Sequence, residues 1–258
     1  MSAEGYPPPS IPDSWPPGGV DAALSRLQQR YLPSLSSMDI LGLLRDPALG
    51  RRGVVASFGA ESAVLMHYVS SALPGISVIF LDTGMHFDET LAYRKELESR
   101  LDIDVIDVRP DTAAVAGDDP DGSLHLRDPD ACCRLRKTFP LQDALVPFDA
   151  WITGRKRAQG GARAALPVIE RDGARIKINP LAHWSSADIA AYFRAHDLPH
   201  HPLTQKGYPS IGCAPCTRRV RKGEDPRAGR WPQMPDKVEC GIHLGPDGRI
   251  VRARNTGQ

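Results

Sequence analysis

Residues 53–82 read GVVASFGAESAVLMHYVSSALPGISVIFLD, and this stretch alternates two kinds of hydrophobic pattern. Its two ends, GVVASF (53–58) and ISVIFLD (76–82), are short runs rich in β-branched residues, which are typical of buried strands. The residues between them have apolar side chains at helical spacing. The stretch therefore predicts strand, helix and strand in succession, which is the repeating unit of a parallel sheet.

The same alternation continues on both sides of this stretch. Further strands are predicted at 103–108, 149–154 and 174–182, and further helices at 21–30, 36–45, 87–101 and 185–196. Asp21, Ser36 and Ser185 are expected to cap three of these helices. The pattern predicts an α/β fold with a parallel sheet and helices on both faces, whose ligands bind at the carboxyl ends of the strands. The acidic segment 109–130 is expected to be a surface excursion.

The composition favours one sizeable globular domain over residues 21–222. The chain has 258 residues, of which 41% are hydrophobic and 24% charged. No run approaches the roughly 20 apolar residues that a membrane span requires. Residues 1–20 are rich in Pro and Gly and lack a secretory pattern, so we expect a flexible leader and a cytoplasmic protein. Residues 223–258 are expected to form a mobile tail that carries one cysteine.

Charge is distributed unevenly along the chain. The net charge is only +1, which argues against a general polyanion binder. Residues 151–177 nevertheless hold seven Lys or Arg against two Asp or Glu, and residues 213–254 hold ten against five. Two basic stretches of this kind could meet one anionic ligand, although solvated surface charge explains either stretch taken alone.

The five cysteines divide into four plus one: adjacent Cys132 and Cys133, then Cys213 and Cys216 in a C-x-x-C motif, then Cys240. Stable disulfides are disfavoured in a reducing cytosol, so metal ligation is the better interpretation of the first four. Four thiolates suit a [4Fe–4S] cluster or a structural zinc ion, and the adjacent pair favours the cluster. A redox C-x-x-C with unrelated buried cysteines is the alternative.

Cys240 is a candidate nucleophile because Lys237 and His243 are close to it in sequence and would favour a thiolate. A cysteine near the end of a chain is also often inert, and its own sequence context does not decide between the two.

Small and polar residues follow three of the predicted strands. The first strand runs into Ser57, Phe58, Gly59, Ala60, Glu61 and Ser62, whose backbone N–H groups could bind a phosphate at a helix N-terminus. Leu-Asp-Thr-Gly follows the second strand, and Thr153-Gly154-Arg155-Lys156-Arg157 follows the fourth. Three strand ends of one parallel sheet are therefore expected to line one crevice.

Together these motifs resemble the sulfonucleotide reductase family, specifically its cluster-containing adenylyl-sulfate reductase branch. The resemblance covers about residues 50–243 and is carried by SFGAES, LDTG, CCRLRK, WITGRKR, NPLAHW, GYPSIGCAPCTR, GEDPRAGR and ECGIH. It implies an adenine nucleotide α-hydrolase-like fold, whose first strand–helix loop is a modified pyrophosphate loop. The Ser-Gly-Gly-x-Asp-Ser of pyrophosphate-cleaving relatives is absent, as expected of a protein that binds a nucleotide without cleaving ATP.

The resemblance also implies a mechanism in sulfate assimilation. Cys132, Cys133, Cys213 and Cys216 would hold a [4Fe–4S] cluster, and the Cys240 thiolate would attack the sulfur of adenosine 5′-phosphosulfate. AMP would leave, and thioredoxin or a similar dithiol would release sulfite from the resulting S-sulfocysteine. The implied substrate-binding residues are residues 57–62 together with Lys137, Thr153, Gly154, Arg157, Arg163, Arg227, Arg230 and His243.

Some positions depart from the family pattern, and rival functions follow from the same residues. Lys156 stands where Arg is frequent, Ser62 where Asp is frequent, and Trp231 alone remains of a tryptophan run. The nearest rival is a reductase of the 3′-phosphorylated sulfonucleotide. An ATP-dependent thiolation enzyme of the same fold and a zinc module that binds nucleic acid are further rivals. We expect neither a nucleic-acid nor a membrane partner, and a homo-oligomer stays open.

Overall fold

The computed structural model describes residue 15, residues 18–34 and 36–234, and residues 237, 239, 241 and 242. Its strands are β1 (Arg52–Ala56), β2 (Ile76–Leu81), β3 (Ile103–Val108), β4 (Ala150–Thr153), β5 (Ile169–Asp172) and β6 (Arg175–Ile178). Its helices are α1 (Gly19–Tyr31), α2 (Ser37–Arg45), α3 (Ser62–Ala72), α4 (Asp88–Arg100), α5 (Thr112–Asp118), α6 (Leu124–Arg127), α7 (Pro129–Cys133), α8 (Phe139–Ala144) and α9 (Ser186–Ala195).

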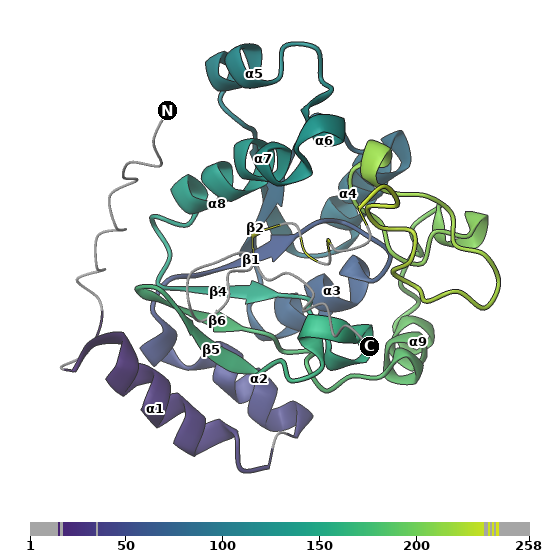
Figure 1. The fold of residues 1–258 in the computed structure, drawn as a ribbon. Helices are drawn as coiled ribbons and strands as arrows, with labels where there is room; N and C mark the ends of the chain where they lie inside the picture. Colours follow the sequence, from purple (N-terminus) through teal and green to yellow (C-terminus); the bar gives the residue numbers. More distant parts are fainter. Residues whose placement is uncertain are drawn as a thin grey trace, which may run out of the picture.

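The strands form one sheet in the order β3-β2-β1-β4-β6-β5 (Figure 1). Neighbouring strands are parallel except for β5, which pairs antiparallel with β6. In the central strand, Val54 lies between Val78 of β2 and Ile152 of β4. The chain moves outward from β1 in both directions, so β1 and β4 flank a topological switch point, where ligands of such sheets bind. The predicted fold class is confirmed.

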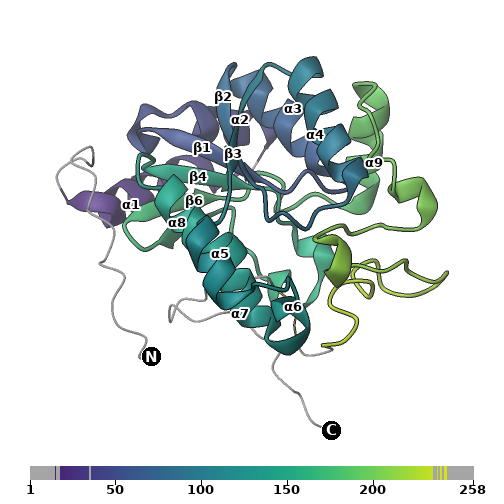
Figure 2. The same ribbon diagram turned by 90° about the horizontal axis from the view of Figure 1, so that it is seen from above.

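Alternating side chains of the strands divide the interior into two cores. Val54 and Ala56 of β1 belong to the larger core, which α1, α2, α3, α4 and α9 cover. Val55 points the other way and joins Trp151 and Leu141 in a smaller core beneath α8. Figures 1 and 2 show α7 and α8 on one side of the sheet and α2 and α3 on the other. A strand period of two therefore gives the two-faced burial that the sequence predicted.

Two of the three predicted helix caps are confirmed. Ser36 and Ser185 each accept a hydrogen bond from the backbone N–H three residues on, within a complete capping box. The prediction for Asp21 is wrong, because α1 begins at Gly19 after Gly18, whose φ of 95° suits glycine. Asp21 lies in the first turn of α1 and forms an ion pair with Arg171.

The acidic excursion contains structure that periodicity does not reveal. It carries the short helices α5 and α6, and Asp111 caps α5 by accepting a hydrogen bond from Ala114 N at 2.8 Å. Helices of four and seven residues are too short for a 3.6-residue period to be recognised. In the described part of the chain, no helix has the length and apolar character needed to cross a membrane.

The predictions about the two ends remain predictions. Most of residues 1–20 lie outside the described residues, although Trp15 Nε1 donates to Ala174 O at 3.2 Å. The described residues after 222 contact the domain: Arg230 forms a β-bridge with Thr217. The cytoplasmic location likewise stays a prediction.

Candidate active site

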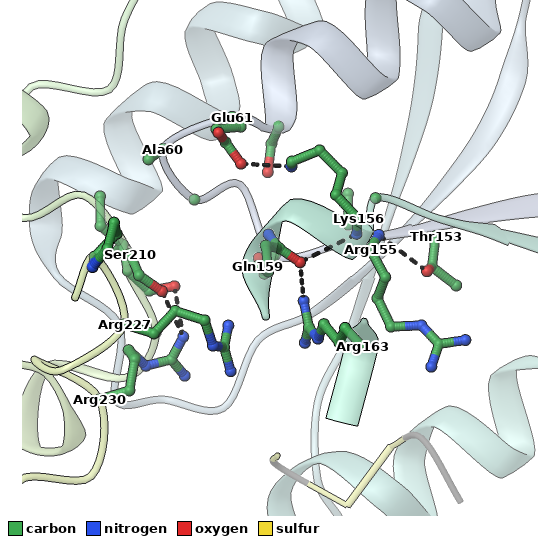
Figure 3. Close-up of a pocket in the computed structure, with 18 of the residues that line it drawn as sticks. Ala60, Glu61, Thr153, Arg155, Lys156, Gln159, Arg163, Ser210, Arg227 and Arg230 are labelled. Atoms are coloured by element: carbon green, nitrogen blue, oxygen red, sulfur yellow. Dashed lines mark hydrogen bonds and ion pairs between the residues drawn. The ribbon is translucent and has the colours of Figure 1, made fainter. Parts of the chain in front are cut away.

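A cavity of about 260 Å³ lies at the carboxyl ends of β1, β2 and β4, as the strand-end residues predicted. Ser57, Gly59, Ala60, Glu61 and Ser62 line it from the β1–α3 loop. Thr153 and Gly154 line it from the end of β4, and Thr153 Oγ1 donates to Asn179 Oδ1 at 2.9 Å. The predicted strand ends thus meet around one cavity (Figure 3).

Phe58 is the one residue of the 57–62 loop that does not line the cavity. Its ring is fully buried and packs edge-on against Phe80, with 5.2 Å between the ring centroids. Its φ of 47° is unusual for a residue with a side chain and reverses the chain direction after β1. Beside it, a Cβ on Gly59 would lie 3.3 Å from Ile211 O, so the loop is pressed against residues near the C-x-x-C motif. Phe58 therefore anchors the loop rather than facing a ligand.

Six cationic side chains line the cavity: Lys137, Arg155, Lys156, Arg163, Arg227 and Arg230. At least three of them form ion pairs with carboxylates of the described residues: Arg155 with Glu170, Lys156 with Glu61, and Arg163 with Glu239. Figure 3 shows Arg227 and Arg163 directed toward each other from opposite walls. The cavity thus combines a positive wall with small loop residues, as an anionic nucleotide requires.

Arg157, which the resemblance placed among the substrate-binding residues, does not line this cavity. Its Nε donates to Leu166 O at 2.8 Å, and its Nη1 lies 3.1 Å from His183 Nδ1. In the structure Arg157 holds the segment that follows β4, whereas the neighbouring Arg155 and Lys156 face the cavity.

Arg230 is held by neutral groups. Its Nη1 donates to Ile211 O at 3.3 Å, and its guanidinium lies 4.5 Å from the centroid of the Trp231 ring. Its buried Nε has no hydrogen-bond partner among the described residues. A Cβ on Gly212 would lie only 2.2 Å from Arg230 Nη2, so glycine at that position is needed for the guanidinium to fit.

A second, smaller cavity is lined by all four predicted cluster cysteines, Cys132, Cys133, Cys213 and Cys216. Lys137, Arg230 and Trp231 line both cavities, so the two spaces adjoin at these side chains. Within the described residues, no three His, Cys, Asp or Glu side chains form a group that could hold a metal ion.

The cysteine pair and the C-x-x-C motif are positioned by the same strand end. Cys132 and Cys133 close α7 and are followed by a π-helical turn, Arg134–Thr138, of a kind often found at functional sites. Thr83, just after β2, lies 3.4 Å through its Oγ1 from Cys213 Sγ, and Ala214 N donates to Met85 O at 2.7 Å. Arg136, in the turn that follows Cys133, donates from Nη1 to Thr83 O at 2.9 Å. The residues after β2 therefore hold the two cysteine segments against each other.

Burial and neighbouring charges shift the pKa values of the thiols in different directions. Burial, Cys213 and other nearby groups raise the pKa of Cys132 to about 11. Burial and Cys213 also raise the pKa of Cys216. Burial opposes ionisation of Cys213 as well, but Lys137, the Thr83 hydroxyl and Arg230 outweigh it and lower the pKa of that thiol. The cations at the junction of the cavities thus favour a thiolate there.

Cys240 and His243 lie outside the described residues, but the neighbours of Cys240 do not. Glu239 lines the larger cavity, and its carboxylate pairs with Arg163. Gly241 O accepts a hydrogen bond from Thr138 Oγ1 at 3.5 Å, and Ile242 packs against the smaller core. The segment on each side of Cys240 therefore contacts the domain beside both cavities.

Residues 53–219 match the model of the phosphoadenosine phosphosulfate reductase domain. The chain belongs to this family. Curated members named adenosine 5′-phosphosulfate reductase include one from Mesorhizobium japonicum, which is 55% identical over 191 residues, 74% of this chain and 75% of the relative. Another, from Streptomyces coelicolor, is 44% identical over 224 residues, 86% of this chain and 94% of the relative. The predictions of the reductase family and of an oxidoreductase are confirmed.

Solved structures agree with this family and fold. A phosphoadenylyl-sulfate reductase from Candida auris, crystallised with phosphate, has 28% identity and a TM-score of 0.61 over 76% of this chain and 96% of its own. An FMN adenylyltransferase from Candida glabrata in complex with ATP has 16% identity and a TM-score of 0.52, over 80% of this chain and 76% of its own, and supports the fold alone. This chain thus shares the adenine nucleotide α-hydrolase-like fold.

Sequence reasoning missed some residues that line the reductase cavity. Ser210 and Asp225 lie in segments quoted for the family resemblance, yet neither was singled out. Glu239 lies 76 positions from Arg163 in sequence, and its acidic side chain gave no sign of facing a cation. The alternation of charge in Lys237 and Glu239 was the available signal, because opposite charges on a segment beside a basic cavity suggest a docking contact.

Proposed function

We propose that the chain reduces adenosine 5′-phosphosulfate to sulfite and AMP, with Cys240 as nucleophile and a dithiol protein such as thioredoxin as electron donor. The observation that carries the proposal is the junction of the two cavities. Lys137 and Arg230 line both the nucleotide-sized space and the space between the four cysteines. A sulfate held at that junction would meet fixed positive charge on one side and the segment around Cys240 on the other.

The proposed reaction consists of three displacement steps at sulfur. The Cys240 thiolate attacks the sulfur of the substrate, a new S–S bond forms, and the bond from sulfur to the phosphate oxygen breaks, so that AMP leaves with the electron pair. A thiolate of the dithiol donor then attacks Cys240 Sγ, and sulfite leaves with the electrons of the S–S bond. The second thiol of the donor displaces Cys240, which returns as a thiolate while the donor becomes a disulfide.

The cations of the cavity have separate tasks in this proposal. An anionic nucleophile that approaches an anionic sulfate needs preorganised positive charge, and a donor of this kind contributes about 3–4 kcal/mol in comparable sites. We assign Arg230 and Lys137, which line both cavities, to the sulfate, and Arg227, which lines the larger cavity, to the nucleotide phosphate, whereas Arg163, paired with Glu239, would shape the wall. The β1–α3 loop would donate hydrogen bonds from its backbone N–H groups to the remaining oxygens.

We further propose that Cys132, Cys133, Cys213 and Cys216 hold a [4Fe–4S] cluster. The donor chemistry fits, because four thiols line one cavity and Lys137 adds positive charge beside what would be an anionic group. The thiols would have to move closer together to bind the cluster, since no three of the described side chains form a metal-binding group as they stand. The cluster, when bound, would supply electrostatic and structural support, since the electrons of the reaction come from the dithiol. The buried Arg136, which donates to Asp119 and to Thr83 O, would hold the cysteine pair in place beside the end of β2.

The decisive experiment is mass spectrometry of anaerobically purified protein after incubation with adenosine 5′-phosphosulfate and before any reductant is added. A sulfite adduct on the Cys240 peptide, released by thioredoxin, is the expected result. Cys240→Ser provides the matched control, because it should bind AMP as well as the unmodified chain does and form no adduct. Adduct formation only from the 3′-phosphorylated substrate would overturn the specificity, and no adduct from either would overturn the proposed mechanism.

The cofactor is tested separately. Purified protein should contain about four iron and four labile sulfide per chain, and Cys213→Ser should lose both. Zinc in place of iron would overturn the cluster proposal without bearing on the nucleophile. ATP hydrolysis by the unmodified chain would favour the thiolation-enzyme alternative.

A further inference from the structure

The segment around Cys240 is held by two buried ion pairs. Lys237 Nζ pairs with Asp130 Oδ1, and the Lys237 side chain is only 4% exposed. Glu239 pairs with Arg163 through both carboxylate oxygens, with 2.7 Å between Arg163 Nη2 and Glu239 Oε2, and its side chain is 6% exposed. Neither pair therefore resembles the exposed ion pairs that hold a surface loop only weakly.

The two pairs have opposite polarity and different anchors. Asp130 is on α7, two positions before Cys132, so the first pair ties the segment to the helix that carries the cysteine pair. Arg163 lines the larger cavity, so the second pair ties the segment to the nucleotide side. Beyond Cys240, Gly241 O accepts from Thr138 and Ile242 packs against the smaller core.

We propose that these two pairs, Lys237–Asp130 and Glu239–Arg163, form a clamp that sets the register of the segment carrying Cys240 across the junction of the cavities. Lys237 and Glu239 are thereby assigned as positioning residues. The chemistry that the clamp serves rests on the proposed function, whereas the docking itself does not.

Opposite polarity is what makes the clamp specific. If the segment slid by two residues, Lys237 would face Arg163 or Glu239 would face Asp130, and like charges would meet in a buried space. Buried ion pairs add little net stability compared with apolar packing, and fixing register is their best-attested use. Lys237 also lies 5.6 Å from the centroid of the Trp231 ring, which already supports Arg230, so the clamp is continuous with the wall of the site.

The clamp must also open. In the proposed reaction Cys240 first meets a nucleotide within the cavity and then a protein dithiol, which needs access to the same sulfur. Opening would return both charges of each ion pair to water, and this hydration offsets the loss of the two pairs and of the hydrogen bond from Thr138 to Gly241 O. Loosening the clamp should therefore reduce the step that needs a docked segment and leave nucleotide binding unchanged.

The test compares Lys237→Glu with the charge-swapped double variant Lys237→Glu/Asp130→Lys in the full-length protein. Docking is measured by hydrogen–deuterium exchange of the peptide spanning residues 231–242, and nucleotide binding by calorimetry with AMP. Lys206→Glu is the matched control, since it makes the same charge change in an exposed pair with Glu89. Lys237→Arg keeps the charge and should behave as the unmodified chain does.

We expect Lys237→Glu to speed exchange of that peptide at least about tenfold and to lower kcat by a similar factor, because two carboxylates would then face each other in a buried space. The AMP dissociation constant should stay within about twofold, since no cavity residue changes, and the double variant should recover most of both losses. Exchange equal to that of Lys206→Glu, or a double variant as fast as the single one, would overturn the clamp. Faster exchange in Lys237→Glu, together with no Cys240 adduct in the unmodified protein, would uphold the clamp and refute the proposed function.

Discussion

Replacing Arg136 by methionine tests how the cysteine-bearing segment is supported. Arg136 is buried in the π-helical turn, and its Nε and Nη2 donate to Asp119 Oδ2 at 3.1 and 2.7 Å. Its Nη1 donates to Thr83 O at 2.9 Å. The Asp119 side chain has no exposed surface, and its other oxygen accepts from Leu124 N. Methionine would fill most of the volume but would leave this carboxylate buried without its cation.

The expected cost follows from that burial. Removing one partner of a buried ion pair destabilises a protein by about 3–5 kcal/mol, because an uncompensated charge remains. A second substitution, Asp119→Asn in the Arg136→Met background, keeps the acceptor for Leu124 N and removes the charge. It should recover at least about half of the loss, since the desolvated charge is the main penalty.

The assay is urea unfolding followed by tryptophan fluorescence under anaerobic conditions, on samples of equal iron content. Arg127→Met is the matched control, because Arg127 pairs with Asp121 on the surface, where both side chains are more than half exposed. That variant should unfold at nearly the same urea concentration as the unmodified chain. A loss below about 1.5 kcal/mol for Arg136→Met, or no recovery in the double variant, would refute the assignment of Arg136 as the partner of a fully buried charge.

Three further outcomes are expected. Burial lowers the pKa of His201 from its ordinary 6.5 to about 4, so between these values the unfolded chain binds a proton that the folded chain does not. The contribution of His201 to the free energy of unfolding should therefore be fully present above about pH 6.5, and about 3 kcal/mol of stability should be lost as the pH drops to about 4. Urea titrations at several pH values should show a correspondingly smaller decrease for His201→Gln. Gly212→Ala should weaken binding of adenosine 5′-phosphosulfate at least about tenfold in the unreactive Cys240→Ser background, because the added Cβ would displace the Arg230 guanidinium assigned to the sulfate. Gly117→Ala, which meets no atom within 4 Å, should leave calorimetric binding unchanged. Lys156→Met should also weaken AMP binding, by about tenfold, because the Glu61 carboxylate would face the anionic ligand without its cation. An unchanged AMP affinity in the same calorimetry would contradict this.

Among the strands that the sequence predicted, β1, β2, β4 and β6 are largely buried, whereas β3 is an edge strand that its repeated Ile and Val residues revealed. β1, β2 and β4 consist mainly of apolar residues because helices cover both sides of the sheet. β5 was missed because it is an edge strand with the sequence IERD, whose polar side chains pair with β6 and with Arg155 instead of entering a core. An edge strand of this kind has no hydrophobic pattern, so only its hairpin partner and Gly173, with a φ of 62°, reveal it.

Some residues of the candidate site could likewise be predicted from the sequence and others could not. The strand-end loops were predictable because parallel strands bring their carboxyl ends to one edge, and the four cysteines because their spacing suited one cofactor. Phe58 was assigned to the site with its neighbours, yet its positive φ turns its ring into the core, which residue type alone does not indicate. Arg157 was preferred to Arg155 for a similar reason, since which of three consecutive basic residues faces a cavity depends on the backbone after β4.

The distribution of carboxylates explains where the cavity can attract an anion. Arg155, Lys156 and Arg163 each meet a carboxylate of the chain, which cancels most of their charge and lets them shape the wall. Arg230 instead meets a carbonyl, a hydroxyl and the Trp231 ring, and within the described residues no ion pair with a carboxylate is found for it. Neutral groups orient a guanidinium without cancelling its charge, so the uncompensated field at this side chain is directed at the junction of the two cavities. The Trp231 ring, 4.5 Å from the guanidinium, supports it at that junction.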